Sequence, residues 1–262
     1  MNLGWWDILA AGFSGGIGVK LLDYVYTEYK RRSEASKSAK ELVNRHIDPI
    51  LKAADEIVGK IRSLAQSDFG EVLRSTGKKE SLDSLMPYLE VLFLFAQFWS
   101  RIQILRMESI YLNLGSDKTG KRLLMFIRAL EATRTRLIDR GWQRGIGEAL
   151  IEHTGTGFCA ISYYEFTKKY LSSEEFRTWI KPLMSILNRI NHTKERQRFL
   201  VYGVILHALI NTLDEKHLLS RDRPGWANKL NVKSQKELRF RIFRIYLPFV
   251  KSPERYYEAG RK

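Results

Sequence analysis

The chain has 262 residues, a formal net charge of +15 and a single cysteine, Cys159. One cysteine excludes an internal disulfide framework and favours a reducing compartment. The length is enough for one large helical domain or two smaller ones.

The first 32 residues have the composition of a membrane anchor. Residues 3–26 are mostly apolar and rich in small side chains. The flanks are Trp5 and Trp6 on one side and Lys30, Arg31 and Arg32 on the other. Aromatic and basic flanks around an apolar stretch are typical of a helix that spans a bilayer or lies at its surface. We predict a transmembrane or interfacial anchor over residues 1–32, with the rest of the chain on the cytoplasmic side.

The uncharged run within this segment is short. It covers residues 8–19, about 18 Å of helix against a hydrocarbon core of about 30 Å. A span would therefore include Asp7 and Lys20, which need a protein partner or water. Gly12 and Gly16 have the spacing that lets helices approach closely in lipid, so we expect a homo-oligomer. An interfacial helix and a helix packed on a soluble core remain alternatives.

Helical periodicity runs through the remainder of the chain. We expect a juxtamembrane segment over residues 33–48 and a helical cytoplasmic domain over residues 49–262. The hydrophobic run at 91–99 lies between charged residues, so it predicts a buried core helix. We also expect a short helix over residues 142–152, broken by the glycine-rich stretch 153–157. An all-α fold, an anchor helix followed by a multi-helix bundle, is the economical architecture.

Capping boxes predict the starts of two of these helices. Ser172 with Glu175 would open one helix, and Ser234 with Glu237 would open another at about residue 238.

Two segments hold most of the excess positive charge. Residues 118–144 contain eight Lys/Arg and two acidic residues, and residues 219–262 contain twelve and four. The candidate binding residues are Arg128, Arg134, Arg136, Arg239, Arg241 and Arg244. We expect them to contact anionic membrane lipid, because the anchor would hold them near headgroups. A nucleic-acid site and an acidic protein partner are the alternatives.

Motifs for catalysis are not recognisable. The chain has no phosphate-binding G-x-x-x-x-G-K-[ST] loop. Its five histidines show no metal-ligand spacing, and we interpret His207 as a core residue. Cys159 between Phe158 and Ala160 fits packing better than nucleophilic chemistry. We therefore predict no catalytic residue, no metal and no cofactor, and we lean away from an enzyme.

One further set of charges lies among aromatic residues. Its members are Arg101, Arg106, Glu108, Asp139, Arg140, Arg144 and Glu148. Charges in such surroundings must pair or reach solvent. They could form a pocket for an anionic ligand or a buried salt-bridge network that fixes helix packing, and we favour the network.

Three stretches, residues 44–69, 95–115 and 137–152, resemble an uncharacterised family of prokaryotic proteins. The resemblance implies an N-terminal apolar helix and an all-helical cytoplasmic domain, with no known activity. Anchored helical proteins also recur as accessory parts of antiviral systems. We therefore expect a membrane-anchored, oligomerising protein that acts by assembly or membrane perturbation, as an antiviral-defence accessory or effector would, together with an unidentified protein partner. A basic helical module that binds nucleic acid is the runner-up.

Overall fold

The computed structural model describes residues 17–70, 72, 82–155 and 157–259, and it describes the side chains of the first helix from Asp23 onward except Arg32. The helices are α2 (Ile17–Gln66), α4 (Leu82–Glu108), α5 (Lys118–Leu130), α6 (Arg140–Ala149), α7 (Tyr163–Ser172), α8 (Glu174–Leu187), α9 (Thr193–Leu213), α10 (Val232–Glu237) and α11 (Glu254–Tyr257). The shorter elements are the 3-10 turns η1 (Leu114–Ser116) and η2 (Ala227–Lys229), the π-helix η3 (Leu238–Tyr246) and the strands β1 (Ile151–Thr154) and β2 (Gly157–Ala160). A mainly helical fold is thus confirmed.

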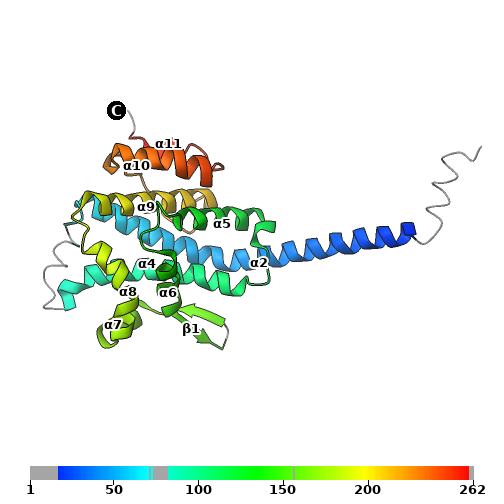
Figure 1. Cartoon of the computed structure of the whole chain (residues 1–262), viewed down its shortest axis with the longest axis horizontal. Helices are drawn as coiled ribbons and strands as arrows, with labels where there is room; N and C mark the ends of the chain where they lie inside the picture. The colour runs from blue at the N-terminus through cyan, green and yellow to red at the C-terminus, as the bar shows by residue number, and fades with distance from the viewer. Residues whose placement is uncertain (1–16, 71, 73–81, 156, 260–262) are drawn as a thin grey trace, which may run out of the picture.

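The helices pack in layers around α2 (Figure 1). On one side α2 contacts α4, which in turn carries α6, α7 and α8. On the other side it contacts α9 and α5, and these are covered by η3 and α11. The helices α4 and α9 lie in the interior and are apolar around most of their circumference, as expected for helices buried on all sides.

The hydrophobic run at 91–99 forms the centre of α4. All of its side chains are buried except Gln97, which is half-buried. The Phe95 ring lies 5.4 Å from Phe199 and 5.7 Å from Tyr202, both on α9. The prediction of a buried core helix here is confirmed, because aromatic faces from α9 and the α6–α8 layer cover it.

Helix α2 is 50 residues long, or about 75 Å at 1.5 Å per residue. Its backbone stays helical through Pro49 and across both predicted segments, 33–48 and 49 onward. Burial begins with Ala39, Leu42 and Val43. The part that precedes them extends away from the bundle (Figure 1).

A β-hairpin replaces the predicted helix break after α6. Residues 151–154 pair antiparallel with residues 157–160, so Glu152 lies opposite Cys159 and His153 opposite Phe158. The His153 and Phe158 rings are 4.2 Å apart. Gly157 has φ +135°, a value that favours glycine. The expectation of helix through residue 152 is wrong, because the chain reverses here and cross-strand pairs stabilise extended backbone.

Two helix starts differ from the predicted capping boxes. Ser173 rather than Ser172 caps α8, with its hydroxyl accepting from the Phe176 amide. Asn231 caps α10 by accepting from the Ser234 amide, so Ser234 is inside the helix. Each helix is capped by the short polar side chain whose oxygen lies nearest to a free backbone amide of the first turn. Which side chain this is depends on the path by which the preceding loop enters the helix.

Candidate functional site

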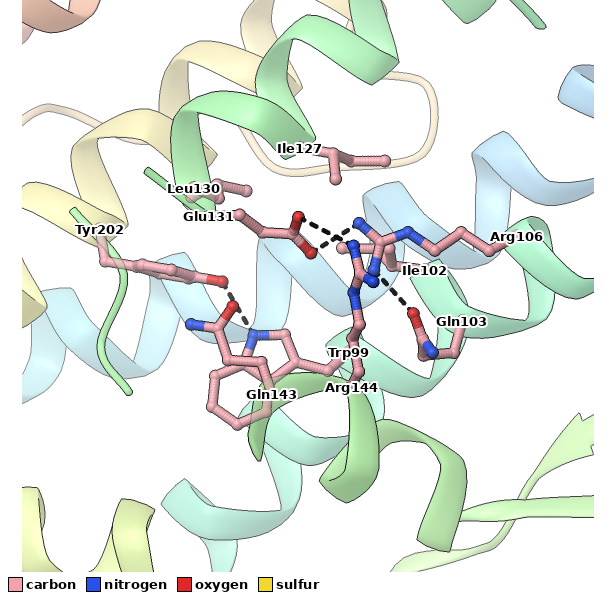
Figure 2. Close-up of a pocket in the computed structure, with 10 residues that line it drawn as sticks. All are labelled: Trp99, Ile102, Gln103, Arg106, Ile127, Leu130, Glu131, Gln143, Arg144 and Tyr202. Carbon is pink, nitrogen blue, oxygen red and sulfur yellow. Dashed lines mark hydrogen bonds and ion pairs between the residues drawn. The ribbon is translucent and has the colours of Figure 1, made fainter. Parts of the chain in front are cut away.

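A cluster of charges lies where α4, the end of α5 and α6 meet (Figure 2). Its centre is Glu131, whose side chain is 12% exposed. The Glu131 carboxylate is 2.6 Å from Arg106 Nη2, 3.5 Å from Arg140 Nε and 3.8 Å from Arg144 Nη2. Three guanidinium groups therefore face one carboxylate, and the cluster has a local charge of +2.

Amide side chains complete the Glu131 cluster. Arg106 Nη1 donates to Gln103 Oε1 at 2.7 Å, and Gln103 Nε2 donates to Glu148 Oε1 at 2.7 Å. Gln143 is 3% exposed, and its Nε2 has no hydrogen-bond partner among the described residues. These groups surround a cavity of about 10 Å³, room for at most one water molecule.

Two aromatic residues form the floor of this cavity. Trp99 Nε1 donates to the Tyr202 hydroxyl at 2.9 Å, and both side chains are buried. Burial raises the pKa of Tyr202 well above its ordinary value, so this phenol stays protonated.

Close approach of α6 to α4 positions the cluster. A Cβ on Gly147 would lie 2.8 Å from the Trp99 carbonyl oxygen, so glycine is required for the two backbones to touch. Asp139 caps α6 by accepting from the Gly141 amide at 2.9 Å, and it pairs with Arg136 at 3.0 Å. The cap and the contact aim Arg140 and Arg144 at Glu131.

The structure brings together Arg106, Arg140, Arg144 and, through Gln103, Glu148 from the predicted polar set. Asp139 caps the helix that carries Arg140 and Arg144, and the remaining two members, Arg101 and Glu108, lie elsewhere. Glu108 contacts His46 at 3.0 Å and Arg45 at 3.5 Å on α2. Arg101 interacts instead with Cys159 and Glu56. Burial lowers the pKa of Arg101, and the interactions with these two residues raise it.

Sequence reasoning missed Glu131, the residue that joins this cluster. The composition of the sequence could have pointed to Glu131, because residues 118–144 contain only two acidic residues and eight basic ones. A carboxylate in a segment with so few acidic residues is expected to attract several guanidinium groups. The cavity has no room for an organic ligand, so we interpret the cluster as a network that fixes the packing of three helices.

The predicted basic residues occupy separate places on the surface. Arg134 and Arg241 both face Glu237 Oε2, at 3.5 and 3.8 Å. Arg239 lies 3.9 Å from Glu258 and over the Phe240 ring at 5.2 Å. Arg128 and Arg244 are exposed.

A basic residue that sequence reasoning missed stands near them. Arg198 donates from Nη2 to the carbonyls of Arg136 and Leu137, at 2.8 and 2.7 Å. Burial lowers its pKa, with Glu195 opposing that effect.

Residues 1–16, half of the predicted anchor, lie outside the described residues. This holds for Trp5, Trp6, Asp7, Gly12 and Gly16, so their roles stay predictions. Lys20 lies on the α2 backbone, and Arg32 also belongs to α2, without described side chains. No helix in the described ranges is long and apolar enough to cross a bilayer, and this finding does not extend to residues 1–16.

Residues 23–38 of α2 form a stalk. None of the described side chains in this range is buried. Tyr24 is 72%, Tyr26 65% and Tyr29 72% exposed. Lys30 is exposed, and the exposed Arg31 pairs with Glu28 at 2.9 Å. The stalk thus presents tyrosine rings and basic groups outside the bundle.

A search of family models, of curated proteins and of solved structures found no match to this chain. The resemblance to a prokaryotic family stays a prediction, and the function has to be argued from the sites themselves.

Proposed function

We propose that this chain is a membrane-tethered helical protein. Its N-terminal residues hold the bilayer, and the stalk holds the helical bundle away from the bilayer surface. The observation that carries the proposal is the exposure of Tyr24, Tyr26 and Tyr29 on a helix that has left its own core.

Exposed tyrosines in a cluster need a physical explanation. A large ring left in water forgoes the 1.5–3 kcal/mol, roughly, that burial of such a side chain contributes. Three rings within six residues would regain part of this at a membrane interface, where the apolar ring and the polar hydroxyl both find suitable surroundings. Lys30 and Arg31, which follow immediately, would then lie at the level of the headgroups.

The geometry of α2 also bears on the runner-up, in which the first helix packs into the core of a nucleic-acid-binding module. The side chains between Asp23 and Ser38 make no buried contact with the described bundle. This favours an external partner for the stalk. Self-association through Gly12 and Gly16 would add an external contact for the residues that precede the stalk.

The test places a fluorophore on the stalk. A Cys159→Ala background with Val25→Cys gives one labelling position on the stalk, where Val25 is 56% exposed. The matched control is Leu171→Cys on α7, where Leu171 is 52% exposed. The labelled full-length chains are reconstituted into liposomes that contain lipids with a nitroxide at the headgroup.

We expect strong quenching of the label at position 25 and little at position 171, because only the stalk would approach the headgroups. The chain should also float with liposomes at 0.5 M salt, where surface electrostatics are screened. A chain that stays at the bottom of the gradient, or equal quenching at both positions, would refute the tether.

A further inference from the structure

A second feature of the molecule is a groove between the N-terminal ends of α9 and α10 and the segment that follows α5. It is lined by the cations Arg134, Lys194, Arg198 and Lys233 and by the single carboxylate Glu237. The groove has a volume of about 640 Å³. We call it the basic groove.

Hydrogen bonds fix the walls of the basic groove. Gln197 Nε2 donates to the Lys229 carbonyl and its Oε1 accepts from the Asn231 amide, both at 3.0 Å. Arg198 is held by the carbonyls that follow α5. Lys194 and Lys233 are exposed, and neither forms an ion pair with any side chain that the structure describes. The groove is therefore a fixed scaffold with two available ammonium groups.

A second hollow of about 670 Å³ lies along α10 and η3. Lys233 and Glu237 line both this hollow and the basic groove, so the second hollow is a continuation of the groove. This hollow adds Lys236, Arg241 and the ring of Phe240, which is 48% exposed. The π-helical turn here, with the Leu247 amide donating to the Ile242 carbonyl at 3.0 Å, is a rare element that often marks functional sites.

The N-terminal ends of α9 and α10, which line the basic groove, lie toward the end of α2 opposite the stalk (Figure 1). Arg196, beside the groove on α9, lies over the Phe69 ring at 6.0 Å, and Lys229 Nζ is 3.5 Å from Asp68. Forty residues of helix separate Tyr26 from Gln66, or roughly 60 Å. A chain held at its stalk would carry the groove away from the headgroups, so lipid is a poor occupant.

We propose that the basic groove and its continuation bind a single-stranded nucleic acid. Phosphates would contact Lys194, Lys233 and Arg134, and a base would stack on Phe240. A basic groove beside an exposed aromatic ring is the combination that single strands require, since every base presents a π-face. Glu237 keeps Arg134 and Arg241 at the groove by pairing with both.

The test uses the full-length chain in nonionic detergent and a fluorescein-labelled ten-nucleotide oligothymidylate, with binding measured by anisotropy. We expect saturable binding that weakens about tenfold in Lys194→Gln/Lys233→Gln, because each lysine neutralises one phosphate. The slope of log affinity against log salt should become shallower by about 1.4. Phe240→Leu should weaken binding about fivefold or more.

The matched control is Lys168→Gln/Lys181→Gln, which removes the same charge from exposed positions on α7 and α8. We expect it to bind like the parent chain. Absence of saturable binding, or an equal loss in the control, would overturn the proposal. So would displacement of the oligonucleotide by soluble short-chain phosphatidylglycerol, since that result would assign the groove to lipid headgroups. None of these results depends on the tether.

Discussion

Replacement of Glu131 by glutamine tests whether one carboxylate holds three helices together. The change keeps the size and shape of the side chain and removes its charge. Arg106, Arg140 and Arg144 would then face one another without a counter-charge at distances now set by Glu131. We expect the folded state to be destabilised.

The size of this loss of stability can be estimated from how exposed each charged side chain is. Loss of one partner of a buried ion pair costs about 3–5 kcal/mol. Glu131 is 12% and Arg106 29% exposed, so we expect loss of this pair to cost nearly as much as loss of a buried ion pair. Arg140 and Arg144 are 51% and 45% exposed, and solvent screening leaves each contact worth less than about 1 kcal/mol. We expect a total loss of about 3 kcal/mol.

Thermal unfolding followed by circular dichroism measures this loss. A chain of 262 residues has an unfolding entropy of roughly 0.55 kcal/mol/K, so Tm should fall by about 5 °C.

The control is Glu165→Gln, which removes a carboxylate that is 40% exposed and 3.9 Å from Lys168. Its Tm should change by less than about 1 °C, as expected for a surface ion pair. If Glu131→Gln also unfolds within 1 °C of the parent chain, the cluster does not hold the helices together and our interpretation of it is refuted.

Two further predictions concern the pH dependence of stability and the contact between α4 and α6. Burial, with Arg255 adding to it, lowers the pKa of His207 to about 4. The neutral His207 side chain therefore stabilises the folded state by about 3 kcal/mol. This contribution is fully present above pH 6.5 and is lost as the pH falls toward 4. The drop in Tm between pH 7 and pH 4.5 should be smaller by several degrees in His207→Asn, and an equal drop would contradict the assignment. Gly147→Ala should lower Tm by roughly 2–5 °C, because its Cβ would meet the Trp99 backbone. Gly155→Ala, which meets nothing within 4 Å, should leave Tm within about 1 °C, and similar values for both variants would rule out the backbone contact.

The pattern of apolar residues along the sequence was sufficient to predict the buried helix α4. The run at 91–99 is apolar except for Gln97 and is bounded by charges, so a buried helix was the economical interpretation. The same reasoning failed at residues 151–160. Each strand there has only four residues, too few for a period-2 pattern to stand out, and their pairing depends on a chain reversal after α6.

The charged residues show a similar division. The periodicity of residues 118–144 does not single out Glu131 among the basic residues around it. The carboxylate gains its role only when α4 and α6 bring three guanidinium groups to it. The basic groove likewise joins Arg134, Lys194 and Lys233, which are up to about a hundred residues apart in the chain.

The sequence by itself determined the properties that depend on neighbours along the chain. These are the helical class of the fold, the buried α4, the excess of positive charge and the aromatic and basic flanks of the N-terminal segment. Tertiary structure decided which charges meet, where α2 leaves the core at Ala39, and that the stalk and the basic groove lie at opposite ends of one helix. The reason is physical: helix formation and amphipathicity are local within a few residues, whereas ion pairs and grooves depend on contacts between segments whose spacing is fixed only by packing.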